Sequence, residues 1–159
     1  MIGSMVRGAV AGAVGTWVMD LVTTGLYDAQ SEEANRREAA AHPNGKGSVE
    51  NLLDRIDSVV GLELDSEQRE RVVEALHYGL GVGPAVLYAL VRRRLPLVRA
   101  GRGVVYGLLL WAVNDEWMNT TLGLAGPYGA YPIEAHWRGL VGHVALGVTT
   151  DTTLDLLGV

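Results

Sequence analysis

The chain contains no cysteine and no phenylalanine, and few of its residues are charged. The absence of cysteine excludes disulfides, zinc–thiolate sites, iron–sulfur clusters and thiol nucleophiles. Charged residues make up 19% of the chain, below the roughly 25% of an ordinary soluble domain. Basic residues are outnumbered by acidic ones, 13 against 18, and the net charge of −5 argues against nucleic acid as a partner.

Motifs of the common enzyme classes are missing as well. The sequence shows no Ser–His–Asp order, no phosphate-binding loop and no His-Glu-x-x-His zinc motif. The glycines of Gly79-Leu80-Gly81-Val82-Gly83 follow no strand pattern, so they do not predict a nucleotide site. The sequence therefore assigns no catalytic residue and no enzymatic activity, and its 159 residues predict a single domain.

Four long stretches of the chain carry almost no charge. They cover residues 8–27, 75–91, 103–122 and 139–157. Each is close to the ~20 residues that a helix needs to cross the ~30 Å hydrocarbon core of a membrane. None alternates as a half-buried strand would, and residues 85–91 and 104–113 have no polar face. The sequence therefore predicts an all-α integral membrane protein, a four-helix bundle in one membrane domain. A soluble bundle of buried helices is the alternative.

The loops between these stretches predict the orientation of the spans. Residues 92–102 carry five arginines and no acid, which places this loop in the cytoplasm by the positive-inside rule. The connection 28–74 carries twelve acids and six bases, a net charge of −6, and is predicted to be external. Both termini would then be cytoplasmic. Asp20 interrupts the first apolar run and the small residues near Ala29 form a poor cleavage site, so we expect the first span to be retained.

The cellular location follows from the same features and from the arginine content. Twelve of the thirteen basic residues are arginines, which suggests a GC-rich prokaryotic genome, so we expect the inner (cytoplasmic) membrane of a prokaryote. The lipid bilayer is the predicted partner. A homo-oligomer and a larger membrane complex both remain open.

The external loop is predicted to contain ordered structure. Residues 48–59 predict a short amphipathic helix on the bundle or at the membrane surface. Its apolar side would consist of Val49, Leu52, Leu53, Ile56 and Val59 or Val60. Asp65 or Ser66 is expected to cap a helix that continues into the second span. Residues 122–132, rich in glycine and proline, predict a structured external loop.

Glycines recur four residues apart within the predicted spans. The rows are Gly8 and Gly12, Gly79 and Gly83, Gly103 and Gly107, and Gly139 and Gly147 with His143 between them. Small residues on one helical face let helices in lipid approach closely. We therefore expect Gly12, Gly83, Gly107 and Gly147 at helix–helix contacts.

Each span also carries an ionisable side chain at nearly one depth. Counted from the cytoplasmic ends, Asp20, His77, Glu116 and His143 all lie about 18–21 Å deep. Ionisable residues in apolar spans are costly and are therefore functional candidates. We expect these four side chains to face one cavity in the outer half of the membrane. Their expected neighbours are Glu74, Asp115 and His136.

Several chemistries suit such a cluster. Imidazole and carboxylate ligands from four helices fit a transition-metal ion such as zinc, iron, manganese or copper, with Asp20, His77, Glu116 and His143 as metal ligands. Only Glu74-Ala75-Leu76-His77 matches the Glu-x-x-His pattern of ferritin-like di-metal sites. A haem between His77 and His143 has no attachment motif to support it. Acids and histidines also suit proton or ion movement. The alternative is a non-catalytic structural or accessory subunit whose buried polar cluster only fixes helix packing.

Three further features occur together: Leu122-Gly123-Leu124 with Pro127, the pair Gly142-His143, and the Gly/Ala-rich run 8–15. In these features, mainly over the last forty residues or so, the sequence resembles the YagU-like inner-membrane proteins of bacteria. That family usually has an acid one turn before the Gly-His pair, where this chain has Gly139. The resemblance implies a multi-span inner-membrane protein and carries over no catalytic residue.

Overall fold

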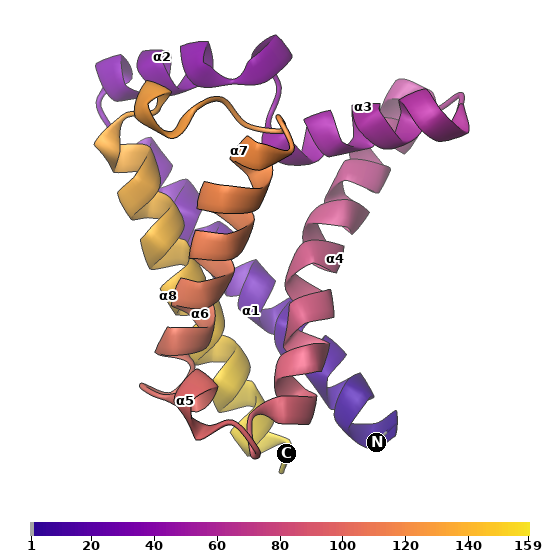
Figure 1. The fold of residues 1–159 in the computed structure, drawn as a ribbon, viewed down its shortest axis with the longest axis vertical. Coiled ribbons are helices and arrows are strands. Elements are labelled where there is room, and N and C mark those ends of the chain that lie inside the picture. The colour runs from indigo at the N-terminus through magenta and orange to yellow at the C-terminus, as the bar shows by residue number, and fades with distance from the viewer. Residues whose placement is uncertain (1) are drawn as a thin grey trace.

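The structure, a computed structural model, describes residues 2–159, which form helices and loops without a β-strand. The all-α prediction is confirmed. Long helical rods form the body of the molecule (Figure 1). They are α1 (Ile2–Asp28), α4 (Ser66–Val91), a third rod of α6 (Val104–Leu110), η2 (Trp111–Met118) and α7 (Asn119–Thr121), and α8 (Ile133–Leu156). Each rod covers one of the four uncharged stretches to within a residue.

Short helices lie at the two ends of the rods. They are α2 (Glu32–Ala41), η1 (Pro43–Gly45), α3 (Ser48–Val60), α5 (Pro96–Arg99) and η3 (Tyr128–Ala130). Figure 1 places α2 and α3 at one end, and α5 with both ends of the described chain at the other. We call the end with α2 and α3 the outer end and the end with α5 the inner end. The acidic connection 28–74 and the arginine-rich loop 92–102 therefore lie at opposite ends of the molecule.

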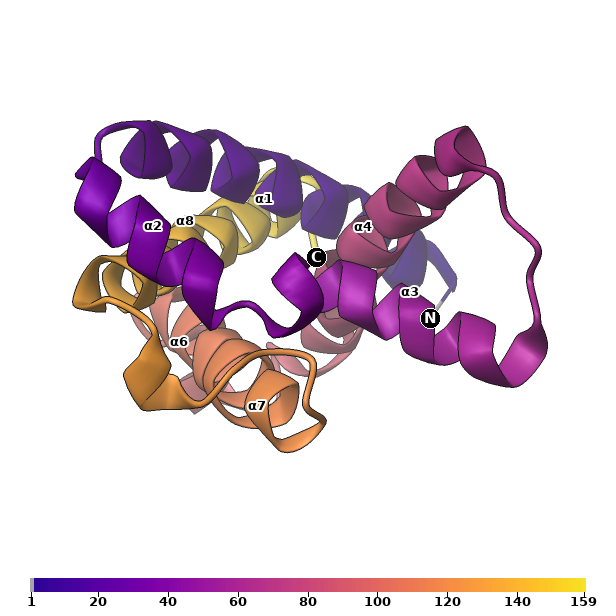
Figure 2. The same ribbon diagram turned by 90° about the horizontal axis from the view of Figure 1, so that it is seen from above.

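The rods do not close into a symmetric bundle. Helix α1 packs along both α4 and α8, and α6 packs along α8. Figure 2 shows α4 splayed away from α6 and α7. One face of α4 is therefore left without a neighbouring rod, and it faces the cavity described below.

Small residues set the close helix crossings. A Cβ atom on Gly12 would lie 2.6 Å from the Cβ of Ala85, where α1 crosses α4. A Cβ on Gly107 would lie 2.9 Å from the carbonyl carbon of His143, and one on Gly147 would lie 3.0 Å from the Cα of Gly107. These three glycines lie at helix contacts as predicted, because only glycine allows backbones this close.

The prediction for Gly83 was wrong. Nothing lies within 4 Å of a Cβ built there. Helix α4 meets α1 with the face that carries Gly81 and Ala85, and Gly83 lies on another face. Spacing alone showed that a small-residue face exists without showing which face has a neighbour.

Local sequence explains where the helices begin. Asp65 Oδ1 accepts from the Gln68 backbone N–H at 2.9 Å, and Gln68 Oε1 accepts from the Asp65 N–H at 3.0 Å. This capping box starts α4, as the sequence predicted. The predicted amphipathic helix is α3, which buries Leu53 and leaves Val59 and Val60 exposed at its tip.

The third rod departs from the predicted regular helix. Its middle, η2, is a π-helix, whose wider turns are rare and are frequent at functional sites. Asn114, Asp115 and Glu116 all lie within it. Of the helices in residues 2–159, only α1 is long and apolar enough by itself to cross a membrane. Membrane insertion of all four rods therefore stays a prediction.

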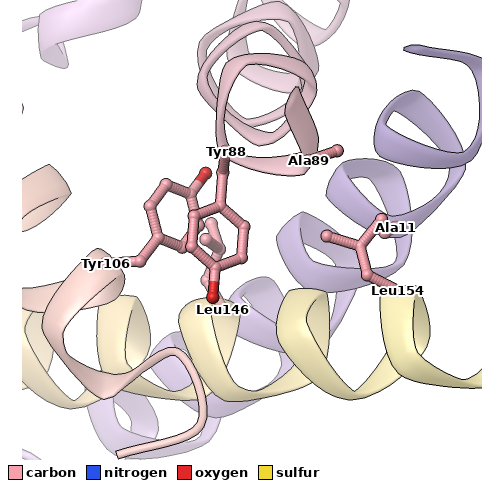
Figure 3. Close-up of a cluster of buried hydrophobic side chains, with 6 residues drawn as sticks. All are labelled: Ala11, Tyr88, Ala89, Tyr106, Leu146 and Leu154. Carbon is pink, nitrogen blue, oxygen red and sulfur yellow. The ribbon is translucent and has the colours of Figure 1, made fainter. Parts of the chain in front are cut away.

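Near the inner end, α4 and α6 are joined by an aromatic pair. The rings of Tyr88 and Tyr106 stack with centroids 4.3 Å apart and planes 14° from parallel. Figure 3 shows them beside Leu146 of α8, with the two hydroxyl groups at opposite ends of the stack. Both tyrosines and Leu146 are buried. The molecule is therefore tightly packed here, whereas its outer half contains the cavity described below.

Candidate functional site

A cavity of about 590 Å³ occupies the outer half of the molecule. Its walls come from all four rods, and α2, α3 and the segment 122–131 cover it from the outer end. All four histidines of the chain line this cavity: His42, His77, His136 and His143. Three of them contact a carboxylate on another helical rod, so the site consists of separate pairs.

The first pair joins α4 to α1. His77 Nε2 lies 2.8 Å from Asp20 Oδ1. An ionised carboxylate only accepts hydrogen bonds, so Nε2 is the donor. Asp20 lies behind His77 and does not itself line the cavity. Its charge therefore orients His77 and does not contact the cavity directly.

The second pair joins α8 to the third rod. His136 Nδ1 lies 2.8 Å from Glu116 Oε1, and Nε2 lies 3.2 Å from the backbone oxygen of Tyr128. A carbonyl only accepts, so Nε2 is the donor to Tyr128. The ring of Tyr128 stacks on His136 with the ring centroids 4.0 Å apart. The imidazole of His136 is therefore held between a carboxylate, a carbonyl and an aromatic ring.

The third pair is looser. His143 Nδ1 donates to the Gly139 backbone oxygen at 2.9 Å and lies 3.4 Å from Asp115 Oδ2. Within residues 2–159 its Nε2 has no hydrogen-bond partner, although the side chain is only 9% exposed. Asp115 accepts one hydrogen bond, from Asn114 Nδ2 at 2.9 Å. Of the three carboxylates, Asp115 is therefore the one whose histidine contact is not a hydrogen bond.

The structure brings most of the predicted site residues together. His77, Glu116 and His143 line one cavity with Asp115 and His136, Asp20 joins through His77, and Glu74 does not line the cavity. In the described chain, residues 2–159, no three or more of these side chains converge so as to hold a metal ion. Binding of a transition-metal ion or haem stays a prediction that this geometry does not favour.

The outer cover of the cavity is fastened by a buried ion pair that the sequence did not reveal. Arg138 of α8 makes two hydrogen bonds to the Glu38 carboxylate of α2, one of them at 2.9 Å. Burial raises the pKa of Glu38, but the hydrogen bonds and charge of Arg138 lower it more, so this pKa lies below its ordinary value. Asn51 adds hydrogen bonds from its Nδ2 to the backbone oxygens of Lys46 at 3.0 Å and Leu124 at 3.1 Å.

A second polar site lies at the inner end and was also missed. Arg92 Nη2 lies 2.9 Å from Asp151 Oδ1, and both side chains are almost fully buried. The Tyr88 hydroxyl donates to the same carboxylate oxygen at 2.6 Å, and Arg99 pairs with Asp155 at 2.8 Å. One signal could have found this network: Asp151 and Asp155 lie one helical turn apart, at the end that carries the arginine loop.

Leu146 and the tyrosine pair separate the two polar sites. Leu146 lines the cavity and belongs to the same buried cluster as Tyr88 and Tyr106. On the other side of this layer, Tyr88 contacts Asp151. Leu146 and the two tyrosines, drawn in Figure 3, therefore lie between the cavity and the inner network.

Comparison of the chain with protein-family models, with curated proteins and with solved structures finds no match. The resemblance to the YagU-like proteins therefore stays a prediction, and the functional argument rests on the geometry of the cavity.

Proposed function

We propose that the protein is a four-span protein of a prokaryotic inner membrane whose outer cavity takes up and releases protons at its His–carboxylate pairs. One observation carries the proposal: all four histidines of the chain line one cavity, and three of them contact a carboxylate on another helical rod. Histidine is the side chain whose ordinary charge change falls between pH 5 and 8. A carboxylate beside it stabilises the charged form, so each pair is suited to bind a proton reversibly.

Outward-facing apolar stripes support a membrane location. Large exposed side chains recur at helical spacing on three of the rods. They are Val6, Val10, Val14, Trp17 and Leu21 on α1; Leu109, Val113 and Trp117 on the third rod; and Ile133, Trp137 and Val141 on α8. The chain exposes 9090 Å², whereas a compact soluble monomer of 17.0 kDa exposes about 7,700 Å². Lipid would cover this apolar surface at no cost.

Reporter fusions test the membrane part of the proposal. A reporter fused after Arg99 should be active only in its cytoplasmic form, because this loop carries the arginines. A reporter inserted near Gly45, in the acidic connection, should be active only in its external form. If both insertions report the same side, the four-span arrangement is wrong.

The proton part is tested by nuclear magnetic resonance of the purified protein with labelled histidine. The chain has four histidines, so single His→Gln variants assign every signal. We expect the signals of His77, His136 and His143 to titrate between pH 5 and 8. If all three keep one protonation state over this range, the pairs serve only helix packing. A stoichiometric bound metal or a haem absorbance band would instead favour the metal interpretation.

A further inference from the structure

We infer that the cavity binds an amphipathic organic cation at Asp115, and that this cation displaces a proton from His143. The inference rests on the proposed proton handling of the same cavity and names the ligand class that would use it. Three features carry it: one incompletely compensated carboxylate, an apolar wall with an aromatic ring beside that carboxylate, and a free imidazole nitrogen.

The charges that line the cavity are unevenly matched. Glu38 is paired with Arg138 through two hydrogen bonds, and Glu116 is paired with His136 at 2.8 Å. Asp115 accepts one hydrogen bond, from the Asn114 amide at 2.9 Å, and lies 3.4 Å from the Nδ1 of His143, which already donates to a backbone oxygen. His77 and Glu116 also lie near enough for their charges to act on it, with opposite signs. The Asp115 side chain is 32% exposed and lines the cavity, so a carboxylate with one hydrogen bond is available there to attract a positive charge.

The cavity wall suits a cation with apolar substituents. Met19, Leu80, Leu110 and Leu146 line it together with Trp111. Trp111 precedes Asp115 by four residues on the third rod, and both side chains line the cavity. An indole face attracts cations, and the adjacent carboxylate adds a full negative charge. The volume of about 590 Å³ lies within the range of roughly 300–1,000 Å³ typical of small-molecule sites.

His143 couples this site to protons. Its Nδ1 carries hydrogen in every protonation state, because it donates to the Gly139 backbone oxygen. Protonation therefore takes place at Nε2, which has no partner within residues 2–159. The protonated imidazole of His143 would then place a positive charge beside Asp115. An organic cation bound at Asp115 places its own positive charge there and disfavours protonation of His143, so the cation and the proton compete for one carboxylate.

Titration calorimetry with tetraphenylphosphonium tests this on the purified full-length protein in detergent at pH 6. We expect saturable binding that weakens at least tenfold in Asp115→Asn. Tetraphenylborate, an anion of the same shape, should show no saturable binding. Glu134→Gln, which neutralises an exposed acid of α8 outside the cavity, is the matched control and should bind as the wild type does. Circular dichroism checks that each variant is folded.

Repeating the titration in two buffers of different ionisation enthalpy counts the protons released. We expect release from the wild type, and loss of most of this release per bound cation in His143→Gln. If Asp115→Asn does not fold, Trp111→Leu changes no charge and should weaken binding severalfold. The inference is overturned if the anion binds as well as the cation, if the Asp115 and Trp111 variants bind as the wild type does, or if His143→Gln releases as many protons. If the histidines titrate but the protein binds no cation, this inference alone is overturned. If the protein binds the cation but its histidines never titrate, the proposed proton function is overturned.

Discussion

Replacing Arg92 by methionine tests the buried ion pair at the inner end of the rods. The guanidinium of Arg92 is fully buried and lies 2.9 Å from Asp151 Oδ1. In Arg92→Met, the Asp151 carboxylate keeps the Tyr88 hydroxyl at 2.6 Å and the Arg99 Nε at 3.5 Å. Removing one partner of a buried pair leaves an uncompensated charge, which costs about 3–5 kcal/mol. At about 2–4 °C per kcal/mol for a chain of this length, the Tm should fall by about 6–20 °C.

A second substitution separates this effect from a loss of packing. Asp151→Leu, added to Arg92→Met, replaces the pair by apolar side chains and should recover part of the lost Tm, because apolar replacement of a buried ion pair is often neutral or stabilising. Arg93→Met is the matched control. Arg93 is exposed and makes one hydrogen bond, to the Gly158 backbone oxygen at 3.3 Å. Its loss should change stability by no more than about 0.5 kcal/mol.

The assay is thermal unfolding of the purified variants followed by circular dichroism. The reasoning is refuted if Arg92→Met lowers the Tm no more than Arg93→Met does. It is also refuted if the effects of Arg92→Met and Asp151→Leu simply add in the double variant, because additivity would show that the two side chains do not depend on each other.

Three further predictions concern packing and the cover of the cavity. Gly107→Leu should lower the free energy of unfolding by about 1–3 kcal/mol, because a Cβ there would lie 3.1 Å from the Val144 Cα. Gly83→Leu is the control and should leave thermal unfolding unchanged; an equal loss of stability in both variants would contradict the prediction. Because the pKa of Glu38 in the folded protein lies below 4.5, its contribution to stability is complete above that pH and is lost as the pH falls through the folded pKa. The difference in Tm between the wild type and Glu38→Gln should therefore shrink as the pH is lowered. A difference that does not depend on pH would refute this. Asn51→Ala should cost about 1–3 kcal/mol and speed hydrogen exchange in residues 122–127, since it leaves carbonyls of the cover unpaired; unchanged exchange there would contradict it.

The sequence predicted the rods well because their signals are local. Long uncharged stretches, the capping residues Asp65 and Gln68, and the amphipathic pattern of 48–59 each depend on neighbouring residues only. The π-helix at 111–118 leaves no comparable mark, since its wider turns depend on the surrounding rods. Gly83 and Gly107 look alike in sequence, and only the arrangement of the rods distinguishes the exposed glycine from the packed one.

The sequence predicted which residues gather at the candidate site and not how they pair. A helix rises by a fixed distance per residue, so counting grouped His77, Glu116 and His143, which line one cavity. Which acid each histidine meets depends on the rotation of each rod about its own axis, which counting does not give. The pairs Glu38–Arg138 and Arg92–Asp151 join residues far apart in the chain. The one-turn spacing of Asp151 and Asp155 marks acids near the arginine loop but does not give their partners, and no local spacing marks Glu38.

The layer of Tyr88, Tyr106 and Leu146 has an electrical consequence. If the rods span a membrane as proposed, this layer separates the outer cavity from the inner network, so part of the membrane voltage falls across it. Arg92 and Asp151 lie on the other side of the layer from the cavity histidines, so any charge that moves between the two sites crosses that part of the membrane field.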